Sequence, residues 1–125
     1  MNTVLVDSDI IIELLRNRNA EVRDRWHTLR DGDATVAYSP VTAAEIWQGA
    51  RDPEESAIDA LFSSIVCVPT DDVIGKRAGE YLRRYYRSHA MELGDAVIAA
   101  TASIHDLLLW TRNKKHYPMR DVRLY

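Results

Sequence analysis

Four polar side chains stand where catalysis could take place: Asp7, Glu45, Asp95 and Asn113. Asp7 ends the apolar run Val4–Val6, Glu45 lies within an apolar helical stretch, Asp95 follows a glycine, and Asn113 follows the run LLLWT. No local motif links them. The carboxyl ends of parallel strands, however, share one edge of a sheet. We therefore expect three carboxylates and one amide to meet in one pocket.

Carboxylates that share a pocket repel one another, and their pKa values rise. A divalent cation relieves this repulsion, and oxygen ligands without cysteine suit Mg²⁺ or Mn²⁺ rather than zinc. Such an ion can activate a bound water as nucleophile, polarise a phosphoryl oxygen and stabilise the leaving oxygen. The set of residues therefore suggests hydrolysis of a phosphodiester by metal-activated water.

Each polar residue also has a structural interpretation, which the spacing leaves open. Asp9 could cap a helix, and Asp95 could stabilise a helix N-terminus. Asn113 could be a turn residue. Glu45 could lie on a helix surface, although its apolar neighbours predict that it is partly buried.

The elements that must position these residues follow from the apolar pattern. Strands are predicted at residues 4–6, 35–40, 65–69, 107–111 and, less clearly, 122–125. Helices are predicted from Ser8 or Asp9 to Arg16, and at 19–33, 41–51, 53–64, 70–89 and 92–106. Ser39 or Thr42 would cap the third helix. The last helix is apolar nearly all round and should be buried.

Strands alternate with helices, and the strands are almost entirely apolar. This pattern indicates an α/β fold with a parallel sheet covered on both faces. The length of 125 residues fits one domain, residues 1–125, with 46% hydrophobic and 28% charged residues. No apolar run approaches the roughly 18 residues of a membrane span, so no membrane partner is expected.

The single cysteine, Cys67, lies in the apolar run SIVCVP and is expected to be a reduced core residue. One cysteine cannot form a disulfide within the chain, and this favours a cytoplasmic location.

The net charge of −3 does not by itself indicate nucleic-acid binding. Basic residues nevertheless gather in two stretches, YLRRYYR and TRNKKH. The first holds Arg83, Arg84 and Arg87, and the second holds Arg112, Lys114, Lys115 and His116. They form either a solvated surface or a contact for an RNA backbone.

Three segments together resemble the PIN-domain family, in particular the VapC-type ribonuclease toxins of bacterial toxin–antitoxin pairs. They are VLVDSDIIIELLR, SPVTAAEIWQGAR and LGDAVIAATASIHDLLLWTRNKKHYPM. The resemblance covers nearly the whole chain. It implies a three-layer α/β/α fold with a central, mainly parallel sheet of four or five strands. It also implies an endoribonuclease that depends on Mg²⁺ or Mn²⁺.

The resemblance places the family's metal-holding acids at Asp7, Glu45 and Asp95. The fourth part of the site maps to Thr111 and Asn113. Many relatives carry a further acid before an aromatic residue, where this chain has His116, so a second metal position is in doubt. Asn113 would complete the site through a metal-bound water, and His116 would either contact substrate phosphate or lie on the surface. Asp9 matches an auxiliary acid of some relatives.

The family also implies partners. These are RNA as substrate, a homodimeric arrangement, and a VapB-like antitoxin that inhibits the toxin in a hetero-oligomer and offers an arginine to the acids. The basic residues Arg112, Lys114, Lys115, Arg83, Arg84 and Arg87 would guide the RNA backbone.

Two other classes compete with this interpretation. The domain could bind RNA or an antitoxin without cutting, because the fourth acid is replaced. The motif DSD after a strand is also similar to that of haloacid-dehalogenase-type phosphatases, but Ala99 stands where that family needs a further acid. A receiver domain fits less well, because no adjacent acidic pair follows the first strand.

Overall fold

The computed structural model describes residues 2–125. Five strands form one sheet in the order β3-β2-β1-β4-β5, and every neighbouring pair is parallel. The strands are β1 (Thr3–Val6), β2 (Thr35–Tyr38), β3 (Val66–Cys67), β4 (Leu108–Trp110) and β5 (Arg123–Leu124). The α/β fold with a parallel sheet that the sequence predicts is confirmed.

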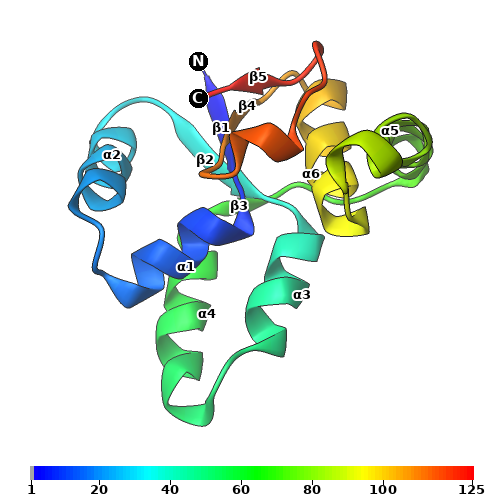
Figure 1. Cartoon of the computed structure of the whole chain (residues 1–125). Helices are drawn as coiled ribbons and strands as arrows, with labels where there is room; N and C mark the ends of the chain where they lie inside the picture. The colour runs from blue at the N-terminus through cyan, green and yellow to red at the C-terminus, as the bar shows by residue number, and fades with distance from the viewer. Residues whose placement is uncertain (1) are drawn as a thin grey trace.

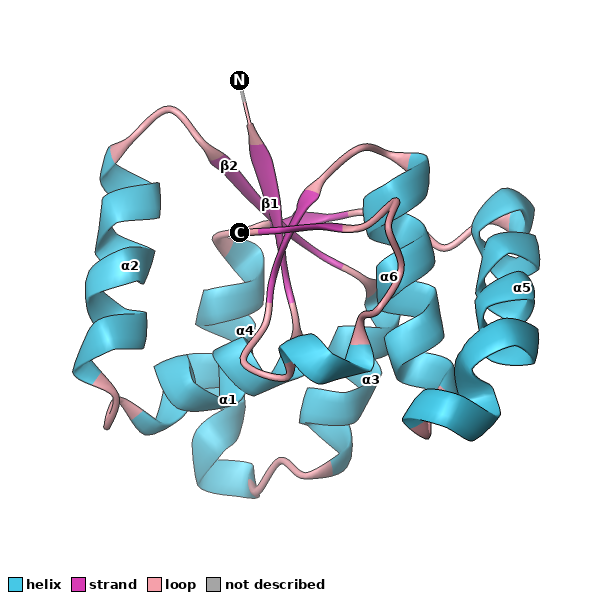
Figure 2. Cartoon of the chain, turned by 45° about the horizontal axis from the view of Figure 1, so that its top comes forward, coloured by secondary structure: helices cyan, strands magenta, loops and turns pink. Residues whose placement is uncertain are grey.

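Six α-helices and two short 3₁₀ helices connect the strands in the described part of the chain. They are α1 (Ser8–Arg16), α2 (Ala20–Asp31), α3 (Pro40–Gln48), η1 (Asp52–Glu54), α4 (Glu55–Ser63), α5 (Asp72–His89), α6 (Leu93–Ile104) and η2 (Lys114–His116). Figure 1 shows α5 and α6 on one side of the sheet, and Figure 2 shows α1, α2 and α4 on the other. The molecule thus has three layers. None of the helices described is long and apolar enough to cross a membrane.

The alternation of side chains along the strands produces two cores. On β1, Leu5 faces the core formed with α5 and α6, whereas Val4 and Val6 face the core of α1, α2 and α4. On β4, Leu109 faces the core formed with α5 and α6, and Trp110 faces the other core. Successive residues of a strand point to opposite faces, so a strand buried on both faces must be apolar throughout.

Helix α6 is the most buried helix, as predicted. Its residues Ala96, Ile98, Ala99, Ala100, Thr101 and Ala102 are buried. Small side chains let α5 pack closely against it, and the Thr101 hydroxyl donates to the Val97 carbonyl at 2.7 Å. Because α6 packs against α5, α3 and β4, these elements hold Asp95 in its first turn.

Three local expectations were wrong. Cys67 is exposed, because β3 has only two residues at the sheet edge and neither is covered. Asp7, rather than Ser8 or Asp9, caps α1: its carboxylate accepts from the Ser8 amide. Glu45 is exposed, because α3 turns this side chain away from the core that buries Ile46. By contrast, Ser39 caps α3 as one of the two predicted candidates.

Candidate metal and RNA-cleavage site

Asp7 is a buried carboxylate with three donors. It is 6% exposed and lies directly after β1. Its Oδ1 accepts from the Ser8 amide at 2.7 Å, and its Oδ2 accepts from the Thr111 and Tyr117 hydroxyls, each at 2.8 Å. These donors keep a buried charge stable and fix the direction of the carboxylate. Oδ1, with one donor, retains capacity for a further ligand.

Asp9 has one satisfied oxygen and one buried oxygen without a partner. Its Oδ2 accepts from the Arg112 amide at 2.9 Å, while Oδ1 is buried and has no hydrogen-bond partner among the residues described. Burial, and then the charge of Asp7, raise the pKa of Asp9 to about 6. A buried carboxylate oxygen without a donor costs free energy unless a cation or water meets it.

Glu45 reaches the same region from α3. The Ser8 hydroxyl donates to its Oε1 at 2.8 Å. A Cβ atom on Gly94 would lie 3.4 Å from both Glu45 carboxylate oxygens, so a glycine leaves room for this side chain beside α6. Desolvation raises the pKa of Glu45, and the charges of Asp7 and Asp95 add to this, although the Ser8 hydrogen bond acts in the opposite direction. Although Glu45 is exposed as a residue, its carboxylate is partly desolvated by this packing.

Asp95 lies in the first turn of α6, where its Oδ2 accepts from the Glu92 amide at 3.3 Å. His116 Nδ1 is 3.7 Å from the same oxygen. Desolvation raises the pKa of Asp95, the Glu92 amide and His116 lower it, and the charge of Asp7 raises it. Asp95 therefore accepts a hydrogen bond at the N-terminus of α6, as its structural interpretation expects, and this does not exclude a role in the site.

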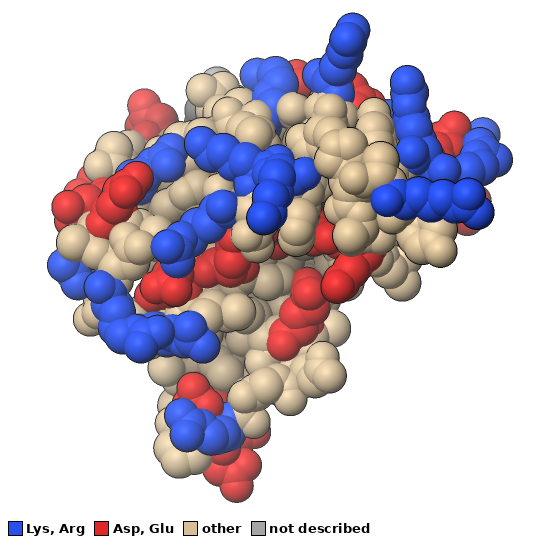
Figure 3. Space-filling view, viewed as in Figure 1, with Lys and Arg blue, Asp and Glu red and all other residues tan. Residues whose placement is uncertain are grey.

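The structure brings the four acids into one electrostatic group. Asp7 raises the pKa of each of the other three, as repulsion in a shared site requires. Figure 3 shows acidic side chains gathered in the middle of one face, with basic side chains around them. Yet within residues 2–125 no three His, Cys, Asp or Glu side chains lie close enough to hold one ion by themselves.

The residues predicted for the fourth part of the site divide into two groups. Thr111 is buried and donates to Asp7, and His116 faces Asp95. Asn113 is exposed; its backbone amide donates to the Thr111 hydroxyl at 3.0 Å, and no hydrogen bond joins its side chain to the acids within residues 2–125. Asn113 thus supports Thr111 through its backbone.

Tyr117 and Ser8 are the two residues of the site that sequence reasoning missed. The sequence shows only that an aromatic residue follows His116, and an aromatic residue before proline usually indicates packing. In the structure, the Tyr117 hydroxyl donates to Asp7. Ser8, considered only as a possible start of the first helix, donates its hydroxyl to Glu45.

The basic residues are distributed unequally. The Arg112 guanidinium pairs with Glu13 at 3.0 Å, so its charge is already matched. Lys114 and Lys115 are exposed on η2, beside the acids of the site. Arg83, Arg84 and Arg87 are exposed on α5.

The residues present fit a hard divalent cation. The side-chain atoms available to a metal are carboxylate oxygens. Asp9 Oδ1 has no hydrogen-bond partner in the described chain, and the charge of Asp7 raises the pKa of Asp9. Mg²⁺ commonly takes only one or two carboxylates and keeps several waters, so it does not require three side chains to converge.

Comparisons with known proteins agree with this architecture. The PIN domain profile matches residues 4–122. Ribonuclease VapC10 of Mycobacterium tuberculosis is 44% identical over 117 residues, which cover 93% of this chain and 86% of that protein. A toxin–antitoxin complex from Klebsiella pneumoniae contains a chain that is 26% identical, with a TM-score of 0.76 and coverage of 95% and 94%. The DNA-bound VapBC of Salmonella typhimurium shares the fold at a TM-score of 0.83 and 17% identity, covering 100% of this chain and 98% of that chain.

The profile match spans almost the whole chain, and the identity to VapC10 extends over nearly its full length. The three-layer fold agrees with that of the similar solved structures. The chain therefore belongs to the PIN-domain family, as its sequence predicts.

Proposed function

We propose that this chain is a metal-dependent endoribonuclease that acts as the toxin of a toxin–antitoxin pair. Its relative VapC10 is named a ribonuclease, and the similar Klebsiella chain comes from a toxin–antitoxin complex. The observation that carries the proposal is the electrostatic group of Asp7, Asp9, Glu45 and Asp95 at the carboxyl ends of the strands.

In this proposal Asp7 and Asp95 hold the ion, Mg²⁺ or Mn²⁺, and Glu45 does so directly or through water. Asp9 offers its partnerless Oδ1 as an auxiliary donor. The bound cation would supply an activated water and neutralise charge on the phosphodiester. Thr111 and Tyr117 orient Asp7, and the Asn113 backbone amide orients Thr111.

Lys114 and Lys115 attract the RNA backbone toward the acids, which would otherwise repel a phosphate. His116 stands where many relatives carry an acid. Beside Asp95, it leaves the site with one negative charge fewer than a site that carries that further acid. This supports a role for His116 toward substrate phosphate and a single principal metal position.

A cavity beside Glu45 is where an antitoxin segment would lie. This cavity of about 200 Å³ between α1, α3 and α4 is lined by apolar side chains together with Arg16, Glu45 and Glu54. The apolar residues of this cavity are Ile12, Leu15, Ile46, Ala50 and Ile58. An apolar segment in this cavity could present an arginine to the carboxylates. We further propose one domain over residues 1–125, a homodimer, and a cytoplasmic location.

A non-catalytic binding module is the alternative, favoured by the replacement of the fourth acid by His116. Calorimetric titration with Mn²⁺ separates the two. The nuclease proposal expects saturable binding at or below millimolar Mn²⁺ that is lost in Asp7→Asn. Incubation with total RNA and Mn²⁺ should also produce new 5′-phosphate ends that EDTA abolishes. The absence of both Mn²⁺ binding and new RNA ends would favour the binding module.

A further inference from the structure

A cavity of about 610 Å³ lies away from the acids, between α5 and the segment 118–121. None of the four acids of the site lines it. Its α5 residues follow a three-and-four spacing, so they share one helix face. The lining consists of Arg77, Glu80, Tyr81, Arg84, Tyr85, Pro118, Arg120 and Asp121. We refer to it as the α5 cavity.

The floor of the α5 cavity is a fixed polar network. The buried Tyr81 hydroxyl donates to Asp121 Oδ2 at 2.7 Å, and Arg77 Nη1 lies 3.2 Å from the same oxygen. Arg77 also lies 3.7 Å from Glu80. Arg77 is therefore the partner of both carboxylates that line the cavity, and the three arginines and two acids of the lining leave a net charge of +1.

Arg84 and Arg120 are the other two arginines of the lining. Both are exposed, and no ion pair joins either to an acid within residues 2–125. A guanidinium presents a planar fork that suits a phosphate. The half-buried Tyr85 ring and Pro118 add an apolar wall, with the Arg84 guanidinium 5.7 Å from the Tyr85 ring centre. Arginine and tyrosine together are what single-stranded RNA contacts through its phosphates and base faces.

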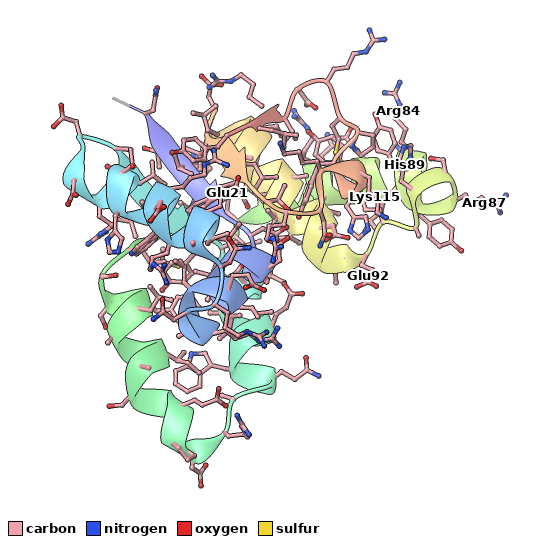
Figure 4. The ribbon with its side chains drawn as sticks, turned by 60° about the vertical axis from the view of Figure 1, so that its left-hand side comes forward. Glu21, Arg84, Arg87, His89, Glu92 and Lys115 are labelled. Carbon is pink, nitrogen blue, oxygen red and sulfur yellow. The ribbon has the colours of Figure 1, made fainter. Side chains whose placement is uncertain are left out.

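The α5 cavity is joined to the acid site by one stretch of chain. Tyr117, which binds Asp7, is followed directly by Pro118 in the cavity wall. Along α6, Asp95 in the site and Ser103 under the cavity are eight residues apart, or about 12 Å of helix. Figure 4 shows Arg84 on the same side of the molecule as Lys115 of η2, whereas Arg87 extends outward from α5.

We propose that the α5 cavity binds a nucleotide of a single-stranded RNA substrate a few nucleotides from the cleaved bond, with Arg84 and Arg120 on its phosphate. This inference rests on the proposed function, because it names a second place of contact for the same substrate. It also separates the arginines of the YLRRYYR stretch: Arg84 lines the cavity, and Arg83 and Arg87 do not.

The test compares two double variants that each remove two positive charges. One is Arg84→Ala with Arg120→Ala, and the matched control is Arg18→Ala with Lys76→Ala, two exposed residues that do not line the cavity. Fluorescence anisotropy with a 12-nucleotide single-stranded RNA is measured in EDTA, so that no cleavage is involved. The cavity variant should bind about tenfold more weakly. The slope of log affinity against log salt should become shallower by about 0.7, because the one phosphate that both arginines contact is no longer neutralised.

Cleavage supplies the second readout. For the 12-nucleotide RNA, the cavity variant should raise KM and leave kcat unchanged. For a dinucleotide, which is too short to span both places, neither should change. The proposal is overturned if the cavity variant binds RNA with wild-type affinity and salt slope, or if the control variant weakens binding equally. If the wild-type chain cuts no RNA, the proposed function fails, while the measurements in EDTA still decide whether the cavity binds RNA.

Discussion

Replacing Tyr117 by phenylalanine removes one hydroxyl and keeps the ring. The residue is 4% exposed, so its packing is preserved. The hydroxyl donates to Asp7 Oδ2 at 2.8 Å. Burial, and then the charge of Asp7, raise the pKa of Tyr117 above its usual range, so this hydroxyl remains a donor at any pH at which the protein is folded.

The magnitude follows from the loss of one hydrogen bond to a buried charge. Such a bond contributes about 1.5–3 kcal/mol. At about 4 °C per kcal/mol for a domain of this size, Tyr117→Phe should lower Tm by about 6–12 °C. Because Asp7 then has only the Thr111 hydroxyl on Oδ2, its direction is less fixed. Loss of a residue that orients a metal ligand typically weakens metal binding about 10–100-fold.

The assay is calorimetric Mn²⁺ titration, with thermal unfolding measured in parallel. Tyr81→Phe is a matched control, since it removes another buried hydroxyl that donates to a carboxylate, Asp121 at 2.7 Å, away from the acids. Both variants should lose stability, and only Tyr117→Phe should lose Mn²⁺ affinity. Wild-type Mn²⁺ affinity in Tyr117→Phe, or an equal loss in Tyr81→Phe, would refute the reasoning.

Three further predictions concern the charges of the site. Asp9→Asn should raise the free energy of unfolding of the metal-free protein by about 1 kcal/mol, measured by chemical unfolding. The rise in the pKa of Asp9 from 3.8 to about 6 corresponds to about 3 kcal/mol, which solvent screening of this half-buried group reduces. A destabilised variant would show that the Asp9 carboxylate supports the fold. Because the pKa of Asp9 is raised in the folded state, the folded protein binds the Asp9 proton more tightly than the unfolded chain does, and the metal-free protein should become more stable as pH falls from 7 to 4. Mn²⁺ affinity should instead fall below pH 6, because the ion needs the ionised carboxylate. A flat Mn²⁺ affinity between pH 5 and 7 would contradict this. His116→Asp should raise Mn²⁺ affinity severalfold by adding a carboxylate near Asp95, and weaker binding would show that His116 supports the ion.

Much of the fold could be predicted because its pattern is repeated. Runs such as Val4–Val6 are short, rich in β-branched residues and apolar at every position, as a strand buried on both faces requires, and the two cores on β1 confirm this. The edge of the sheet was harder to predict. The run SIVCVP is as apolar as β1, yet Cys67 is exposed, because burial at an edge depends on which helices cover it.

The candidate site could be predicted only at the level of residue types. Strand order places Asp7 and Thr111 together, since β1 and β4 are neighbours in the sheet. No local pattern could reveal that the Tyr117 hydroxyl reaches Asp7, 110 residues away in the sequence, or that Asp9 Oδ1 is left without a partner in the described chain. Both depend on side-chain directions that tertiary packing sets.

The most direct test of the central claim is cleavage of a defined RNA by the wild-type chain, Asp7→Asn and Asp95→Asn, with Mg²⁺ or Mn²⁺. The variants must first show cooperative unfolding like that of the wild type. We predict metal-dependent cleavage by the wild type. In both variants the cleavage rate should fall on the order of 100-fold, because each variant removes a carboxylate charge that would hold the ion, and metal affinity falls accordingly. Undiminished cleavage by either folded variant would contradict the assignment of that acid to the metal site.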